Sequence, residues 1–144
     1  MKLQVLEFVS DKCAPCGGKC CKSYPGTAIP KDFGDSREEV IRKVRKLVVE
    51  GDWTLDCWEE DRQAPRTLFV RPATVGAEKY TFDASYGGRC TFLNDEFGCV
   101  LARKEMPSQC RSLDPDNGCK GMGKLEAALA WEDYQDFLRN LSRA

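Results

Sequence analysis

The residues of this 144-residue chain that could do chemistry are nine cysteines, and histidine is absent. The densest group is Cys13-Ala-Pro-Cys16-Gly-Gly-Lys-Cys20-Cys21, which sets four thiols within nine residues. A CxxC pair can place two sulfurs on one metal ion, because two intervening residues let the chain fold around it. The two glycines free the backbone that follows the pair. This spacing predicts a thiolate metal site in a loop.

A second group of cysteines is more widely spaced and consists of Cys90, Cys99, Cys110 and Cys119. Predicted hairpins and turns surround them, and loops carry metal ligands well because their backbone can bend to the geometry of the metal. Cys57 stands alone on a predicted strand, where we interpret it as a small buried hydrophobic residue. A disulfide framework is disfavoured, because a chain of this length buries a sizeable core without cross-links.

The absence of histidine excludes a Ser-His-Asp triad, a Cys-His nucleophile pair and any histidine-ligated zinc. No catalytic residue is predicted, so an enzyme would have to be an iron–sulfur-dependent redox or transferase protein. Ligation by thiolates alone selects zinc or iron–sulfur centres. The adjacent Cys20 and Cys21, together with the missing histidine, favour an iron–sulfur cluster as cofactor. Structural zinc in two four-thiolate sites remains the alternative.

Charge and hydropathy restrict the partners. Lys and Arg number 22 against 23 Asp and Glu, a balance that argues against nucleic acid as a partner. The longest strictly apolar run is five residues, Ala127 to Trp131, so no membrane span is predicted. Glu7 interrupts the apolar stretch that a signal peptide needs. We therefore expect a cytoplasmic protein, whose thiols stay reduced and bind metal ions.

Two helices should position these loops. The first is predicted from Asp35 to Glu50, with Ser36 and Glu39 forming a capping-box pattern and Gly51 ending the helix. The second is predicted from Lys124 to Leu141. Its apolar stripe consists of Ala127, Trp131, Tyr134, Leu138 and Leu141.

Short strands complete the pattern. Residues 53–58 and 67–72 have the β-branched and aromatic content of strands, and residues 80–82 are a candidate third strand. Cys90–Leu93 and Cys99–Leu101 flank a five-residue loop and are predicted to form a hairpin. We expect one α+β domain over residues 1–144, with two main helices, a few short strands and cysteine-rich metal-binding loops.

The order of the cysteine motifs resembles the YkgJ-like cysteine-cluster family, whose domains are described as zinc- or iron-chelating and carry a CxxCxxCC motif. The matching blocks are residues 13–21 and 88–113. They contain Cys13-x-x-Cys16, Cys20-Cys21, Cys90-x-Phe92-Leu93, Gly98-Cys99 and Pro107-x-x-Cys110-Arg111. The chain departs from the pattern in two places. Three residues rather than two precede Cys20, and Met106 stands where the family commonly has Arg.

The resemblance implies about eight metal-binding cysteines, enough for two centres of four thiolates. Seven match the motifs, and we choose Cys119 as the eighth, with Cys57 as the alternative. The predicted ligands are Cys13, Cys16, Cys20, Cys21, Cys90, Cys99, Cys110 and Cys119. Three roles stay open: a metal protein that carries electrons to a redox partner, an iron–sulfur enzyme, and an interaction module stapled by zinc.

Overall fold

A computed structural model describes residues 25–58, 67–83, 88–94, 96, 98–112 and 124–143. The regular elements within them combine short helices with two small antiparallel sheets, which confirms the predicted α+β class. In chain order they are η1 (Pro30–Asp32), α4 (Arg37–Glu50), β1 (Trp53–Trp58), β2 (Thr67–Pro72), β3 (Leu93–Asn94), β4 (Gly98–Cys99), η2 (Arg103–Glu105), α5 (Ser108–Ser112), α6 (Lys124–Leu129), η4 (Glu132–Tyr134) and α7 (Gln135–Ser142).

The first predicted helix is confirmed as α4. Its N-cap is Ser36, whose hydroxyl accepts the Glu39 amide at 3.2 Å. The Glu39 carboxylate accepts from the amide of Asp35 rather than that of Ser36, so only one half of the capping box forms. Gly51 adopts φ 104°, the left-handed conformation that glycine takes at a helix C-terminus. The helix buries a valine stripe consisting of Val40, Val44 and Val48.

Strands β1 and β2 have the predicted bounds and pair antiparallel, from Trp53 opposite Pro72 to Trp58 opposite Thr67. The predicted third strand forms only one bridge, in which Phe82 lies parallel to Leu55. Continuing that ladder would need a hydrogen bond from the Cys57 amide to the Asp83 carbonyl. The Cys57 amide instead donates to Asp56 Oδ1, and the Asp83 carbonyl accepts from Arg71.

The predicted C-terminal helix is divided into α6, η4 and α7. Trp131 lies at the break, fully buried, and its indole Nε1 donates to the Ala28 carbonyl at 2.7 Å. The Gln135 side chain exchanges two hydrogen bonds with the Leu68 backbone on β2. These long-range contacts stabilise the break, while Leu138 and Leu141 remain buried on the predicted stripe.

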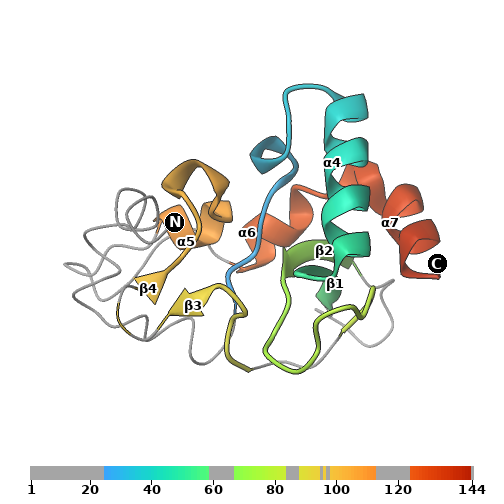
Figure 1. The fold of residues 1–144 in the computed structure, drawn as a ribbon. Coiled ribbons are helices and arrows are strands. Elements are labelled where there is room, and N and C mark those ends of the chain that lie inside the picture. The colour runs from blue at the N-terminus through green and yellow to red at the C-terminus, as the bar shows by residue number, and fades with distance from the viewer. Residues whose placement is uncertain are drawn as a thin grey trace.

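The main hydrophobic cluster joins α4, β1, β2 and α7. Aromatic rings meet at its centre, where Phe33 packs edge-on against Trp53 with ring centroids 5.4 Å apart. Figure 1 shows α4 and α7 at one end of the molecule and β3, β4 and α5 at the other, with α6 between them. In the part of the chain that the structure describes, no helix has both the length and the apolar character to cross a bilayer.

Candidate metal centre

The structure describes four of the nine cysteines. Cys57 lies on β1, Cys90 precedes β3, Cys99 is on β4 and Cys110 is in α5. The exposed fractions of Cys57, Cys90 and Cys99 are 3%, 4% and 7%, and Cys110 is half-buried. No disulfide joins any two of these four. The other predicted ligands, Cys13, Cys16, Cys20, Cys21 and Cys119, lie outside the described residues.

The predicted hairpin forms with two-residue strands that include Asn94 and Gly98 from the predicted loop, so Cys99 lies on β4 and Cys90 lies before β3. Leu93 pairs with Cys99, and the Leu93 amide donates to the Cys90 carbonyl across a tight turn. Such a turn brings its end Cα atoms within about 7 Å, and cross-strand Cα atoms lie about 5 Å apart. The hairpin therefore holds Cys90 and Cys99 within roughly 12 Å of each other by these two steps.

Cys90 is also tied to the larger sheet. It forms an antiparallel bridge with Thr74, which follows β2 closely in the chain. The amide of Thr91 donates to the Ala73 carbonyl at 3.0 Å, and the amide of Val75 donates to the Arg89 carbonyl at 2.8 Å. The chain around Cys90 is therefore fixed by backbone hydrogen bonds on both sides.

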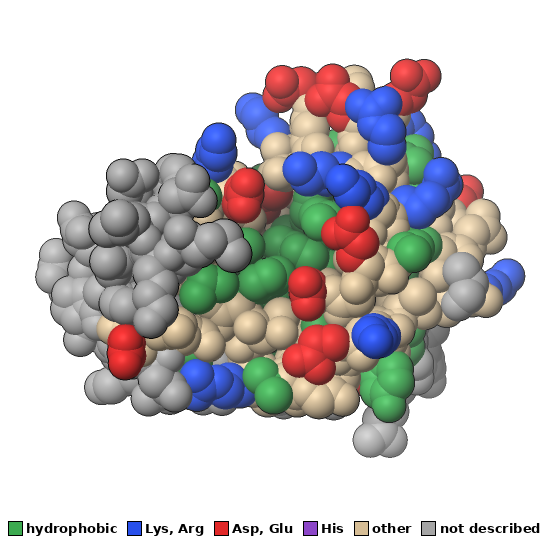
Figure 2. Space-filling model, in the orientation of Figure 1, with side chains coloured by type: hydrophobic (Ala, Val, Ile, Leu, Met, Phe, Trp, Pro, Cys, Tyr) green, Lys and Arg blue, Asp and Glu red, His purple; other side chains and the backbone are tan. Residues whose placement is uncertain are grey.

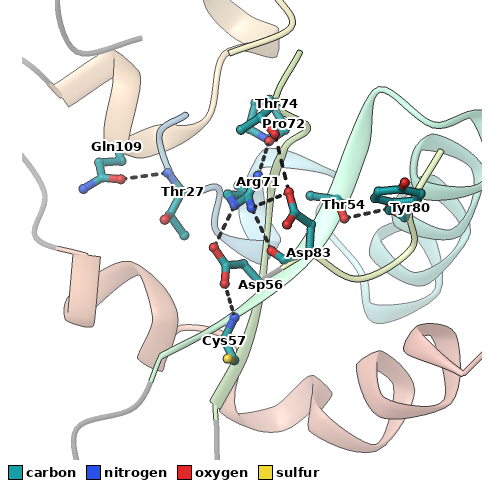
Figure 3. Close-up of polar contacts among 10 residues, drawn as sticks. All are labelled: Thr27, Thr54, Asp56, Cys57, Arg71, Pro72, Thr74, Tyr80, Asp83 and Gln109. Atoms are coloured by element: carbon teal, nitrogen blue, oxygen red, sulfur yellow. Dashed lines mark hydrogen bonds and ion pairs between the residues drawn. The ribbon is translucent and has the colours of Figure 1, made fainter. Parts of the chain in front are cut away.

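Cys110 lies against the backbone of Gly26. A side chain at Gly26 would overlap the Cys110 sulfur and approach the Cys110 amide to 3.2 Å. The neighbouring Thr27 amide donates to Gln109 Oε1 at 2.7 Å, and the Gln109 amide donates to the Thr27 carbonyl at 3.1 Å (Figure 3). The chain that follows the first cysteine block is thus bonded to the helix that carries Cys110.

The start of α5 is held by Asp32. The carboxylate of Asp32 accepts the Ser108 amide at 2.8 Å and the Ser108 hydroxyl at 2.6 Å, and it also accepts the Ile29 amide. Met106, at the position where the resembled family commonly has Arg, is 1% exposed and packs inside the protein. Together these contacts fix the orientation of α5 relative to residues 26–32.

The structure also contains a buried cluster of charged side chains that was not predicted from the sequence. Arg71 Nε donates to Asp56 Oδ2 at 2.8 Å, and its terminal nitrogen donates to the Asp83 carbonyl at 2.8 Å (Figure 3). The same nitrogen lies 3.3 Å from the carboxylate oxygen Asp83 Oδ2, which also accepts the Thr74 hydroxyl at 3.4 Å. Asp56 and Arg71 lie diagonally on one face of the β1–β2 pair. The pairing register of β1 and β2 was therefore the sequence signal from which their ion pair could have been predicted.

The carboxylate of Glu78 accepts a hydrogen bond close to Cys90 in the chain. Its carboxylate accepts the Gly76 amide at 2.8 Å and the Thr91 hydroxyl at 3.3 Å. Hydrogen bonds from the Glu78 and Gly76 amides, and then from Thr91, lower the pKa of Glu78 below 4.5. The ionised carboxylate therefore links the turn after β2 to the residue that follows Cys90.

Within the described ranges, no three cysteine, aspartate or glutamate side chains come together as a metal site. Cys90, Cys99 and Cys110 therefore do not form a three-ligand group among themselves, and Cys57 belongs to the main hydrophobic cluster. Any centre that uses these three must draw on further ligands. Their thiolates suit zinc or iron–sulfur chemistry.

Comparison with known proteins gives no relative: no family model, curated protein or solved structure matches the chain.

Proposed function

We propose that the chain is a cysteine-thiolate metal-binding protein that holds an iron–sulfur cluster and has an electron-transfer or accessory redox role. The observation that carries the proposal is the unequal environment of the buried cysteines. Cys57 belongs to the main hydrophobic cluster, as a core residue should. Cys90 and Cys99 are almost as deeply buried but lie outside that cluster. Cys90 and Cys99 are thus both buried within one ten-residue stretch and outside the main cluster, a placement that supports a ligand role.

The position of Cys110 supports a joint use of the two cysteine blocks. Gly26, which lies against the Cys110 sulfur, follows Cys21 by five residues. Because an extended residue spans at most about 3.6 Å, this connection limits Cys21 to within about 18 Å of Gly26. Chain connectivity therefore permits ligands from both blocks to meet, in keeping with the resemblance to the YkgJ-like family.

The adjacent Cys20 and Cys21 and the absence of histidine are the sequence features that favour an iron–sulfur centre. The chain has no histidine, so every soft protein donor that it offers is a cysteine sulfur or a methionine thioether. Four thiolates hold either a zinc ion or an iron–sulfur cluster. A cytoplasmic location belongs to the same proposal, because reducing conditions keep the thiols available for metal.

Metal and sulfide analysis of protein purified without air tests the proposal. We expect a brown protein containing iron and acid-labile sulfide. A colourless protein with two zinc ions per chain would establish the zinc-stapled module instead. If neither metal is present and thiol titration finds few reduced cysteines, the metal proposal is wrong and a disulfide framework takes its place.

A further inference from the structure

A hollow with an apolar floor lies between α4 and the hairpin region, by which we mean residues 90–105 around β3 and β4. It encloses about 510 Å³, within the range of small-molecule sites. Figure 2 shows hydrophobic side chains gathered in this depression, with charged side chains around them. The buried rings of Phe33 and Trp53 form part of the lining, and the half-buried Leu47, Phe92 and Leu101 complete its apolar surface.

Aromatic rings follow one another along this lining. The ring centroids of Phe33 and Trp53 lie 5.4 Å apart, and those of Trp53 and Phe92 lie 5.8 Å apart. Aromatic faces attract cations as well as apolar groups, and tryptophan does so most strongly. The floor therefore offers an apolar surface in which the half-buried Phe92 is the most accessible of the three rings.

The charged side chains around the rim favour a positively charged ligand. Four carboxylates and two ammonium groups line the hollow, a formal charge of −2. The carboxylate of Asp32 accepts a hydrogen bond from the Ser108 hydroxyl. The other three carboxylates are exposed and form no ion pair with any described residue; they are Glu50, Asp52 and Glu105. The three exposed carboxylates come from the end of α4, the turn before β1 and η2, so they approach the hollow from separate segments.

A neighbouring hollow has the opposite, positive charge. It is lined by Phe33, Glu39, Arg42, Lys43 and Lys46, so basic residues predominate further along α4. Lys43 belongs to both hollows. An anionic ligand would be drawn toward this second surface, and the sign of the preferred ligand therefore distinguishes the two.

We propose that the hollow between α4 and the hairpin region binds a small organic cation with an apolar body, of the aryl- or alkylammonium class. The apolar part packs on Phe92 and Leu101, and the charge lies toward Glu50 and Asp52. This site is independent of the metal proposal, because none of its lining residues is a cysteine.

An NMR titration of the metal-loaded full chain tests the site, with benzyltrimethylammonium as the cation, benzenesulfonate as the anion and benzyl alcohol as the neutral probe. We expect saturable shifts of the Leu47, Phe92 and Leu101 amides with the cation, and weaker binding of the other two probes. Equal or tighter binding of the anion or the alcohol, or no saturable shift with the cation, would overturn the proposal.

Charge variants locate the binding. The double variant Glu50→Gln, Asp52→Asn should weaken cation binding about fivefold at low salt, because each carboxylate lies near the expected charge. Glu38→Gln removes one negative charge at the other end of α4, outside the hollow, and should leave the affinity unchanged, whereas Glu50→Gln alone should weaken it. Lys43→Gln should strengthen cation binding. Equal effects of the double variant and Glu38→Gln would contradict this location.

Discussion

The two ends of the molecule achieve burial in different ways. The end with α4, β1, β2 and α7 has helices and strands of 6 to 14 residues and a continuous hydrophobic cluster. The other end has two-residue strands and the five-residue helix α5. Helices and hairpins this short are marginal by themselves. The difference teaches that the hairpin end depends on contacts beyond its own secondary structure, and the proposed metal would supply them.

The largest expected effect comes from removing proposed ligands. Cys99→Ser and Cys110→Ser should each lower metal content and reduce hydrogen-exchange protection in β3, β4 and α5, because binding free energy contributes to folding free energy. Protection in α4 should persist. Metal analysis and amide exchange measure the two outcomes.

Cys57→Ala is the control for these variants. It removes a buried sulfur from the main cluster, so it should reduce the stability of the α4 end while leaving the metal content unchanged. Unchanged metal content in Cys99→Ser and Cys110→Ser would refute their assignment as ligands. Loss of metal in Cys57→Ala would instead identify Cys57 as the eighth ligand.

The next effect concerns the buried charges on the β1–β2 pair. Arg71→Leu should lower the free energy of unfolding by about 3–5 kcal/mol, because it leaves buried carboxylates without their cation. Chemical denaturation of the metal-loaded protein measures the change. The double variant Arg71→Leu, Asp56→Leu should recover part of the loss, and a double variant less stable than Arg71→Leu would contradict the explanation.

Gly26→Ala should have a smaller effect, about 1–3 kcal/mol, because the added methyl overlaps the Cys110 sulfur and α5 must shift. A double-mutant cycle with Cys110→Ala isolates this contact. In the Cys110→Ala background the cost of Gly26→Ala should fall. An equal cost in both backgrounds would show that the overlap with sulfur is not its cause.

The smallest effect concerns Glu78. Its lowered pKa means that the ionised form stabilises the fold above pH 4.5, and that this contribution is lost as the pH falls through the folded-state pKa. An NMR titration of the carboxyl group should give a pKa below 4.5, and Thr91→Val should raise it slightly. A pKa at or above 4.5 in the parent protein would contradict the proposed hydrogen bonds.

The parts of the fold that local signals determine could be predicted from the sequence. Ser36 and Gly51 delimit α4, and the strands β1 and β2 have the predicted bounds. The third strand stops after one bridge because the Asp56 carboxylate takes the amide of Cys57. The C-terminal helix breaks where Trp131 reaches Ala28, a contact across 103 residues that no local pattern encodes.

The sequence indicated which residue types could form the candidate centre, but not the tertiary contacts that hold the segments around them. The order of the motifs proposes Cys90, Cys99 and Cys110 as ligands, which stays a prediction, whereas the close approach of Gly26 to Cys110 depends on the tertiary fold. Gln109 and Asp32 carry no motif that would indicate their bonds to Thr27 and Ser108. The roles of the cysteines outside the described residues stay predictions.

The bond between Thr27 and Gln109 also has a consequence for the order of folding. It joins residues 82 positions apart, so it cannot form until most of the chain has been synthesised. At roughly 5–20 residues per second, translation separates these two residues by roughly 4–16 s. The first cysteine block is therefore made seconds before the helix that carries Cys110, and a centre that uses ligands from both blocks can be completed only after that interval.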